Sequence, residues 1–254
     1  MPSKRRKARE SALKALYQHD LVNNDAMVAL SQIIADDILQ PALEAFSREF
    51  ALQTIENETQ TGEIERFIAE FSGRVLSEKI SENQIESIAR DLITDIFPNF
   101  ISHSECALLT QNFIQKTISK IESTKEIENF ARDLVNQTIR NLKNIDSILI
   151  KFADHWSLER MASIDRCILR FAICELLFFK SIPVNVTINE AIELSKKFST
   201  ERSGEFVNGI LDKVQRELSP EKDDPRKRKG AAEKQALACD NDDPSSDTGT
   251  EKPS

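Results

Sequence analysis

The sequence has few of the residues that interrupt helices: it contains six glycines and eight prolines in 254 residues. Extended alternation of apolar and polar residues is also missing. Apolar residues instead recur every three or four positions up to about residue 218. That spacing places them on one face of a helix, whereas half-buried strands need the alternation that is absent. The sequence therefore predicts an all-α fold.

Long hydrophobic runs are absent as well. A membrane-spanning helix needs roughly 20 consecutive apolar residues, and no run in the sequence approaches that length. The basic start is followed by a segment that is too polar for the core of a signal peptide. We therefore expect a cytoplasmic protein with no membrane partner.

Residues with metal, redox or nucleotide chemistry are scarce. No pair of the four cysteines has CxxC spacing, and the three histidines are widely separated. This pattern is typical of small buried thiols, not of a zinc site or a disulfide framework. A glycine-rich strand-to-helix turn for a nucleotide cofactor is also missing. We expect no metal, no cofactor and no catalytic residue. The cysteines are Cys106, Cys167, Cys174 and Cys239.

The composition changes near the C-terminal end. Residues 220–254 have almost no large apolar side chain and carry blocks of both charges. Such a segment cannot bury enough apolar surface to offset the entropy lost on ordering. We predict a helical domain over residues 1–219 and a disordered charged tail over residues 220–254.

The first predicted helix begins with an unfavourable charge distribution. Ser3 is its expected N-cap, and five basic residues follow in a chain whose net charge is −8. An exposed cation there costs about 0.3–1 kcal/mol, because the helix dipole already presents positive charge. An anionic partner would offset this cost, and a solvated chain terminus is the alternative. The basic residues are Lys4, Arg5, Arg6, Lys7 and Arg9.

Two further helices are predicted in the C-terminal half. Residues 164–180 are strongly apolar, yet Arg166 and Arg170 lie four residues apart on one stripe. One edge of this central helix must therefore reach water, a carboxylate or a phosphate. Beyond the break at Pro183, Thr187 and Glu190 have the spacing of a capping box, which predicts a helix start at residue 188.

At these residues the chain closely resembles the NusB family of bacterial transcription antitermination factors. The resemblance rests on VNVTINEAIELSKKFSTERSGEFVNGILDKV, residues 184–214, together with RRKARESALKALYQ near the start. It covers about residues 3–22 and 124–218. The resemblance implies an all-helical RNA-binding protein made of two small helical bundles. Residues 23–123 are far longer than the corresponding part of the family, so we interpret them as a helical insertion.

The resemblance also implies a function and partners. Members of this family pair with ribosomal protein S-ten (NusE) and bind the single-stranded boxA element of nascent ribosomal RNA. The complex joins other Nus factors on RNA polymerase and favours processive transcription. The resemblance therefore implies transcription antitermination without catalysis.

Single-stranded RNA offers phosphates to basic side chains and unstacked bases to aromatic rings. In the resemblance, the five basic residues of the first helix supply phosphate contacts, and Tyr17 supplies stacking or a hydrogen bond. Core packing is the alternative for the aromatic residues, and an internal salt bridge is the alternative for Arg170. The further RNA-binding candidates are Arg170, Lys197, Phe198, Arg202 and Phe206.

The ribosomal partner is basic, so its docking surface should be acidic. Glu159 and Asp165 match positions on the partner-facing side of the family, and Glu190 and Glu193 are further candidates. The alternative is that these carboxylates cap helices or solvate a surface.

Two other classes of protein must be weighed. Some ribosomal-RNA cytosine methyltransferases carry a NusB-like domain, but this sequence has no Pro-Cys nucleophile motif and ends too early for a catalytic domain. The second alternative is a protein-binding helical adaptor that has lost RNA specificity and whose enlarged middle segment provides the interface.

Overall fold

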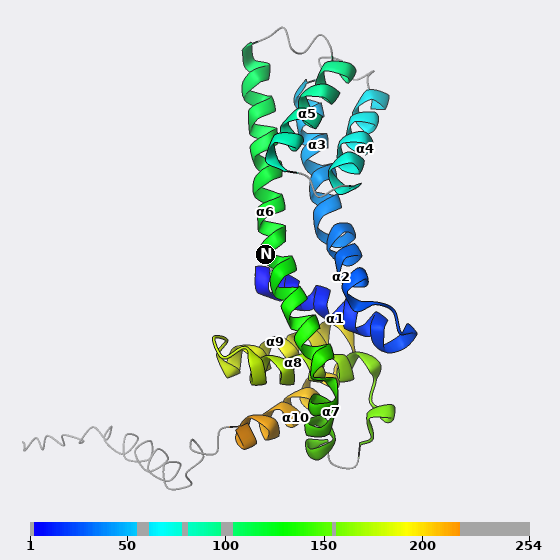
Figure 1. The fold of residues 1–254 in the computed structure, drawn as a ribbon, viewed down its shortest axis with the longest axis vertical. Helices are drawn as coiled ribbons and strands as arrows, with labels where there is room; N and C mark the ends of the chain where they lie inside the picture. Colours follow the sequence, from blue (N-terminus) through cyan, green and yellow to red (C-terminus); the bar gives the residue numbers. More distant parts are fainter. Residues whose placement is uncertain (1–2, 55–60, 78–80, 98–103, 154–155, 219–254) are drawn as a thin grey trace, which may run out of the picture.

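Helices make up every regular element in the described part of the chain, residues 3–54, 61–77, 81–97, 104–153 and 156–218. This computed structural model confirms the predicted all-α fold (Figure 1). The predicted disordered tail lies outside the described residues. The α-helices are α1 (Lys4–Val22), α2 (Ala26–Ile34), α3 (Gln40–Thr54), α4 (Thr61–Ser77), α5 (Glu82–Ile96), α6 (Ser104–Arg140), α7 (Leu142–Phe152), α8 (Ser163–Phe178), α9 (Val184–Phe198) and α10 (Ser203–Leu218).

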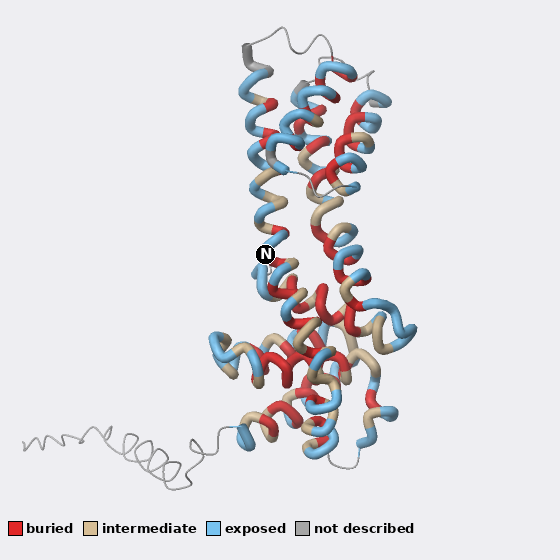
Figure 2. Tube along the Cα trace, viewed as in Figure 1, coloured by how far each residue is buried: buried red, intermediate tan, exposed pale blue. Residues whose placement is uncertain are grey.

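The buried apolar side chains form two separate cores, which appear as two groups of buried residues in Figure 2. The first core joins α1, α2 and the C-terminal half of α6 to α7, α8, α9 and α10. The second joins α3, α4, α5 and the N-terminal half of α6, and its buried residues run from Leu43 to Ile114. The second core therefore lies wholly within residues 23–123, whereas α2, in the same segment, packs into the first core.

Two long helical connections link the cores. One is α6, with 37 residues, and the other is the continuous run from α2 through the π-helical turn η1 (Ala35–Leu39) into α3 (Figure 1). The π turn ends just before Pro41, with the backbone N–H of Gln40 donating to the carbonyl of Ala35. Because proline has no N–H and its ring crowds the preceding turn, a local widening of the helix accommodates it.

This continuous run is more apolar than the sequence analysis expected. The helix Ala26–Gln53 is long and apolar enough to cross a membrane by length and composition alone, although polar residues interrupt its apolar runs. Buried core helices pass the same test. Here Leu30 and Ile34 pack into the first core, and Leu43 and Phe50 into the second.

The aromatic centre of the second core yields a stability prediction. Phe67 is fully buried, and its ring centroid lies 5.5–5.9 Å from those of Phe50, Phe71, Phe97 and Phe113. Substitution of Phe67 by alanine should lower the free energy of unfolding by about 3–5 kcal/mol, because it removes these contacts and leaves a cavity. Urea denaturation followed by far-UV circular dichroism measures this loss.

The matched control is Leu52→Ala, which truncates an exposed apolar side chain of α3. Its effect should stay within about 0.5 kcal/mol. Equal effects of the two substitutions would contradict the assignment of an independent second core.

Candidate nucleic-acid interface

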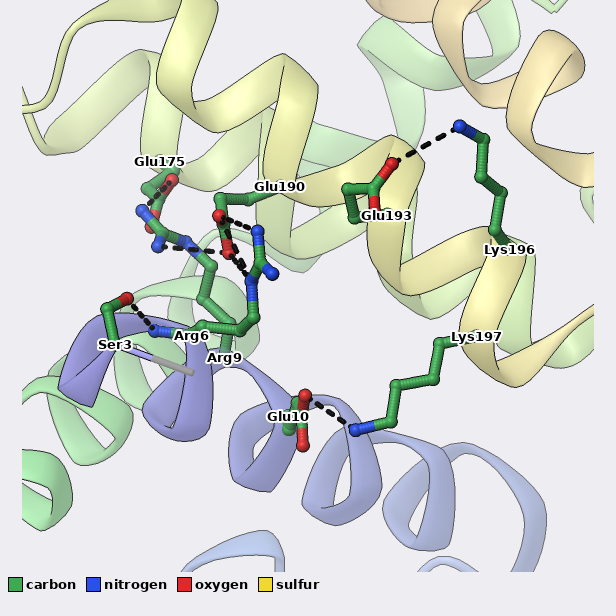
Figure 3. Close-up of polar contacts among 9 residues, drawn as sticks. All are labelled: Ser3, Arg6, Arg9, Glu10, Glu175, Glu190, Glu193, Lys196 and Lys197. Carbon is green, nitrogen blue, oxygen red and sulfur yellow. Dashed lines mark hydrogen bonds and ion pairs between the residues drawn. The ribbon is translucent and has the colours of Figure 1, made fainter. Parts of the chain in front are cut away.

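A buried ion pair fixes α1 against the central helix α8. The side chain of Arg9 is only 2% exposed, and that of Glu175 is fully buried. The Arg9 guanidinium donates from Nε to Glu175 Oε1 at 2.9 Å and from Nη2 to Oε2 at 3.0 Å (Figure 3). Thr187 of α9 donates its hydroxyl to the same carboxylate at 2.7 Å. Arg9 therefore joins three helices and does not reach the surface, which the sequence analysis did not anticipate.

A second ion pair joins α1 to α9 at the edge of this buried pair. Arg6 donates from Nε to Glu190 Oε2 at 2.9 Å and from Nη2 to Oε1 at 2.6 Å (Figure 3). The hydrogen bond from Arg6 lowers the pKa of Glu190, although burial acts in the opposite direction. Glu190 is thus held as a carboxylate by Arg6, and both side chains are engaged within the fold.

The predicted capping box at Thr187 and Glu190 is wrong. α9 begins at Val184, directly after Pro183, so both residues lie inside the helix. Tertiary contacts explain the difference. The Thr187 hydroxyl turns to the buried Glu175, and the Glu190 carboxylate turns to Arg6, instead of satisfying backbone groups at a helix start. By contrast, the Ser3 cap of α1 is confirmed, because its hydroxyl accepts from the Arg6 backbone N–H at 3.2 Å.

The two arginines on the stripe of α8 are also paired within the protein. Arg170 donates to Asp146 from Nε at 2.7 Å and from Nη2 at 2.9 Å, and to Asp20 from Nη1 at 2.6 Å. Arg166 also pairs with Asp20. Burial favours a raised pKa for Asp20, but hydrogen bonds from Arg166 and Arg170 outweigh it and lower that pKa. The internal salt bridge, the alternative stated for Arg170, is therefore the arrangement in this structure.

Other basic candidates remain available at the surface. Arg5 and Arg202 are exposed and Lys7 is half-buried, and none of the three makes an ion pair within the described residues. The guanidinium of Arg5 lies 4.1 Å from the centroid of the Phe130 ring. Burial, together with the nearby charge of Lys7, lowers the pKa of Lys120 on α6.

Two lysine candidates pair with carboxylates of other helices. Lys4 lies 2.8 Å from Glu126, and both side chains are more than half exposed. Lys197 donates to Glu10 at 2.7 Å (Figure 3), and its ammonium lies 4.9 Å from the centroid of the Phe198 ring. An exposed pair such as that of Lys4 contributes little to stability, so Lys4 can exchange its partner for a phosphate at small cost. The side chain of Glu10, by contrast, is only 19% exposed.

The aromatic candidates are all half-buried. Tyr17, Phe198 and Phe206 pack against the first core and keep part of their surface exposed. The ring of Phe206 also contacts Trp156, with centroids 5.8 Å apart. The sequence analysis missed Trp156. The available signal was that it is the only tryptophan of the chain.

The acidic candidates divide into exposed residues and residues that are engaged within the fold. Glu159 is exposed, and Glu193 is exposed beside Lys196, at 3.2 Å (Figure 3). Asp165 is only 6% exposed and accepts a hydrogen bond from the Ser203 hydroxyl at 2.9 Å. The contact joins the first turns of α8 and α10. Asp165 and Glu190 therefore shape the fold here, and Glu159 and Glu193 present their charge to solvent.

Reactive groups have no evident role in this region. Cys167 and Cys174 are free and buried, and burial raises their pKa values to about 12 and about 11 respectively. Both thiols therefore stay protonated at neutral pH. Among the described residues, no three His, Cys, Asp or Glu side chains are grouped so that they could hold a metal ion.

The structure thus defines an all-helical protein whose basic first helix is docked by buried ion pairs and carries free cations along its outer edge. The NusB family matches residues 87–216, which are 130 of the 254 residues. The chain belongs to the NusB family, which confirms the resemblance seen in the sequence.

Transcription antitermination protein NusB from Thermotoga sp. (strain RQ2) is 51% identical over 80 residues, covering 32% of this chain and 56% of the relative. The protein of the same name from Thermodesulfovibrio yellowstonii is 52% identical over 80 residues, covering 32% and 53%. The chain thus spans just over half the length of these curated relatives. Among solved structures, T. maritima NusB is 26% identical with a TM-score of 0.46, covering 84% of this chain and 92% of that one.

The buried pair predicts a large stability effect for one α1 residue. The change Arg9→Met should lower the free energy of unfolding by about 3–5 kcal/mol, because it leaves the Glu175 carboxylate buried without its cation. Urea denaturation measures the loss. The control Arg48→Met breaks an exposed pair with Glu65 and should cost at most about 1 kcal/mol. A variant Arg9→Met as stable as the unmodified chain would contradict this role.

Proposed function

We propose that this protein binds single-stranded boxA-type RNA of nascent ribosomal transcripts together with ribosomal protein S-ten (NusE). In this proposal it acts in the cytoplasm as a transcription antitermination factor on RNA polymerase with other Nus factors. Family membership and the names of the relatives, which are transcription antitermination proteins, support the proposal. No catalytic step is part of it.

The observation that carries the proposal is the division of the basic residues of α1 into two groups. Arg6 and Arg9 are held by buried or half-buried carboxylates, whereas Arg5 and Lys7 are not paired within the described residues. Unpaired cations at the positive end of a helix favour an anionic ligand. Phosphates of RNA match this requirement, and Lys197 and Arg202 extend the positive edge to the turn between α9 and α10.

Aromatic rings on α1, α9 and α10 fit an RNA ligand better than an isolated anion. Tyr17, Phe198 and Phe206 each keep part of the ring exposed. Unstacked bases of a single strand pack on such rings in a sequence-tolerant way. In the same proposal, Glu159 and Glu193 offer exposed carboxylates to the basic ribosomal partner, and Asp165 and Glu190 hold the helices that carry them.

The second core supports one alternative function. Residues 43–114 form a separate set of buried side chains with its own charged surface. A helical adaptor that binds protein through this bundle and has lost RNA specificity would use that surface. The two functions differ in the surface used: the antitermination factor would bind RNA along α1, and the adaptor would bind protein through the second bundle.

Salt dependence tests the RNA proposal directly. The triple variant Arg5→Ala, Lys7→Ala and Arg202→Ala should bind a labelled single-stranded boxA-like RNA more weakly. The slope of log affinity against log salt should become less negative by about 2, since each phosphate contact to a single strand contributes about −0.7. Fluorescence anisotropy at several salt concentrations, with and without ribosomal protein S-ten, provides the measurement.

The matched control removes three exposed arginines of the second bundle, with the changes Arg48→Ala, Arg66→Ala and Arg90→Ala. It lowers the net charge equally and should leave the slope unchanged. Equal weak binding to boxA-like and scrambled RNA, unaffected by the ribosomal protein, would instead favour the adaptor.

A further inference from the structure

The only tryptophan of the chain is a large aromatic side chain that the fold leaves half open. Trp156 is 50% exposed, although burial of an indole ring is strongly favourable. It lies in the connection between α7 and α8, directly before the short 3₁₀ turn Leu158–Arg160. An aromatic ring held open at the surface is typical of a contact site for another molecule.

Two side chains flank the indole ring. On one side the Phe206 ring of α10 lies with its centroid 5.8 Å away, at an interplanar angle of 60°. The guanidinium carbon of Arg160 lies 5.9 Å from the centroid of the Trp156 ring. An indole beside a second ring and a guanidinium provides stacking surface and positive charge at one place. We call Trp156, Arg160 and Phe206 the aromatic platform.

Hydrogen bonds hold the turn that follows Trp156 and the helix that carries Phe206. Arg166 donates to the carbonyl of Leu158 at 2.6 Å, and the following Met161 is buried in the first core. The hydrogen bond from the Ser203 hydroxyl to the Asp165 carboxylate holds the first turn of α10, the helix that carries Phe206. These contacts restrict the backbone that carries Arg160 and Phe206, which reduces the entropy cost of binding.

The platform lies next to Arg202, in a stretch where Glu201 and Glu205 are also exposed. Phe206 lies one helical turn beyond Arg202, whose carbonyl accepts from the Phe206 backbone N–H at 3.3 Å. Arg202 in turn follows Lys197 and Phe198 across the turn between α9 and α10.

We propose that the aromatic platform binds one unstacked base of a single-stranded RNA, with the base stacked on the exposed part of the Trp156 ring and Arg160 beside its phosphate. This inference rests on the proposed RNA-binding function and assigns a further contact to it. A stacked base is favoured over a peptide because the platform combines two ring faces with a cation at one place.

The fluorescence of the single tryptophan reports directly on binding at the platform. We would titrate the full chain with a labelled single-stranded boxA-like RNA, and follow indole emission and RNA anisotropy in parallel. Stacking should quench the emission, with the same saturation point as the anisotropy. The change Trp156→Ala should weaken binding about 5- to 100-fold, as expected for the loss of one stacked base. It should leave the salt slope unchanged, since no charge is removed.

Two further variants separate stacking from folding. Trp156→Phe retains a ring and should restore most of the affinity. Phe178→Ala removes another exposed aromatic ring, at the C-terminal end of α8, and should bind RNA as the unmodified chain does. Circular dichroism melts verify that each variant is folded.

The outcomes distinguish this inference from the function on which it rests. RNA binding without quenching, and with full affinity in Trp156→Ala, would overturn the platform and leave the proposed function intact. Absence of RNA binding by the unmodified chain would overturn both. Quenching by ribosomal protein S-ten alone, with no further change on adding RNA, would overturn the inference and assign the platform to the protein partner.

Discussion

The ion pair between Arg9 and Glu175 is the interaction on which the arrangement of the first core depends. Burying both charges is costly, and the cost is offset because the contact is bidentate and Thr187 satisfies the carboxylate further. The pair sets the rotation of α1 against α8 and α9. Since residues on a helix face fixed directions, this rotation also decides which cations of α1 point outward. Arg6 is turned to Glu190, and Arg5 and Lys7 make no ion pair within the described residues.

Segregation of charge explains how an acidic chain can present a basic edge. The net charge is −8, yet several carboxylates are placed where they neutralise arginines inside the fold, as Asp20 and Asp146 do for Arg170. Among the basic side chains that make no ion pair within the described residues are Arg5 and Lys7 of α1 and Arg202 near the turn after α9. A ligand approaching this edge meets a local potential that the total charge does not reveal.

Local patterns in the sequence predicted the helices well, because apolar spacing and caps are properties of neighbouring residues. The Ser3 cap and the break at Pro183 are examples. Partners distant in the chain could not be predicted: Arg9 and Glu175 are 166 residues apart, and the pattern of α1 does not distinguish a buried arginine from an exposed one. The predicted capping box at Thr187 was wrong for the same reason, because the partner of its hydroxyl, Glu175, lies 12 residues away in the chain. Amphipathic spacing likewise shows that a helix buries one face, but not that α3, α4 and α5 bury theirs in a second core.

The central claim is that RNA binds the first bundle along α1 and the turn between α9 and α10, and not the second bundle. Photo-crosslinking of the full chain to boxA-like RNA containing 4-thiouridine, followed by mass spectrometry of the peptides, tests it most directly. The account predicts crosslinks within residues 3–17, 197–206 and 156–160, and none within residues 43–97. Crosslinks confined to residues 43–97 would contradict it, because they would place the RNA on the second bundle.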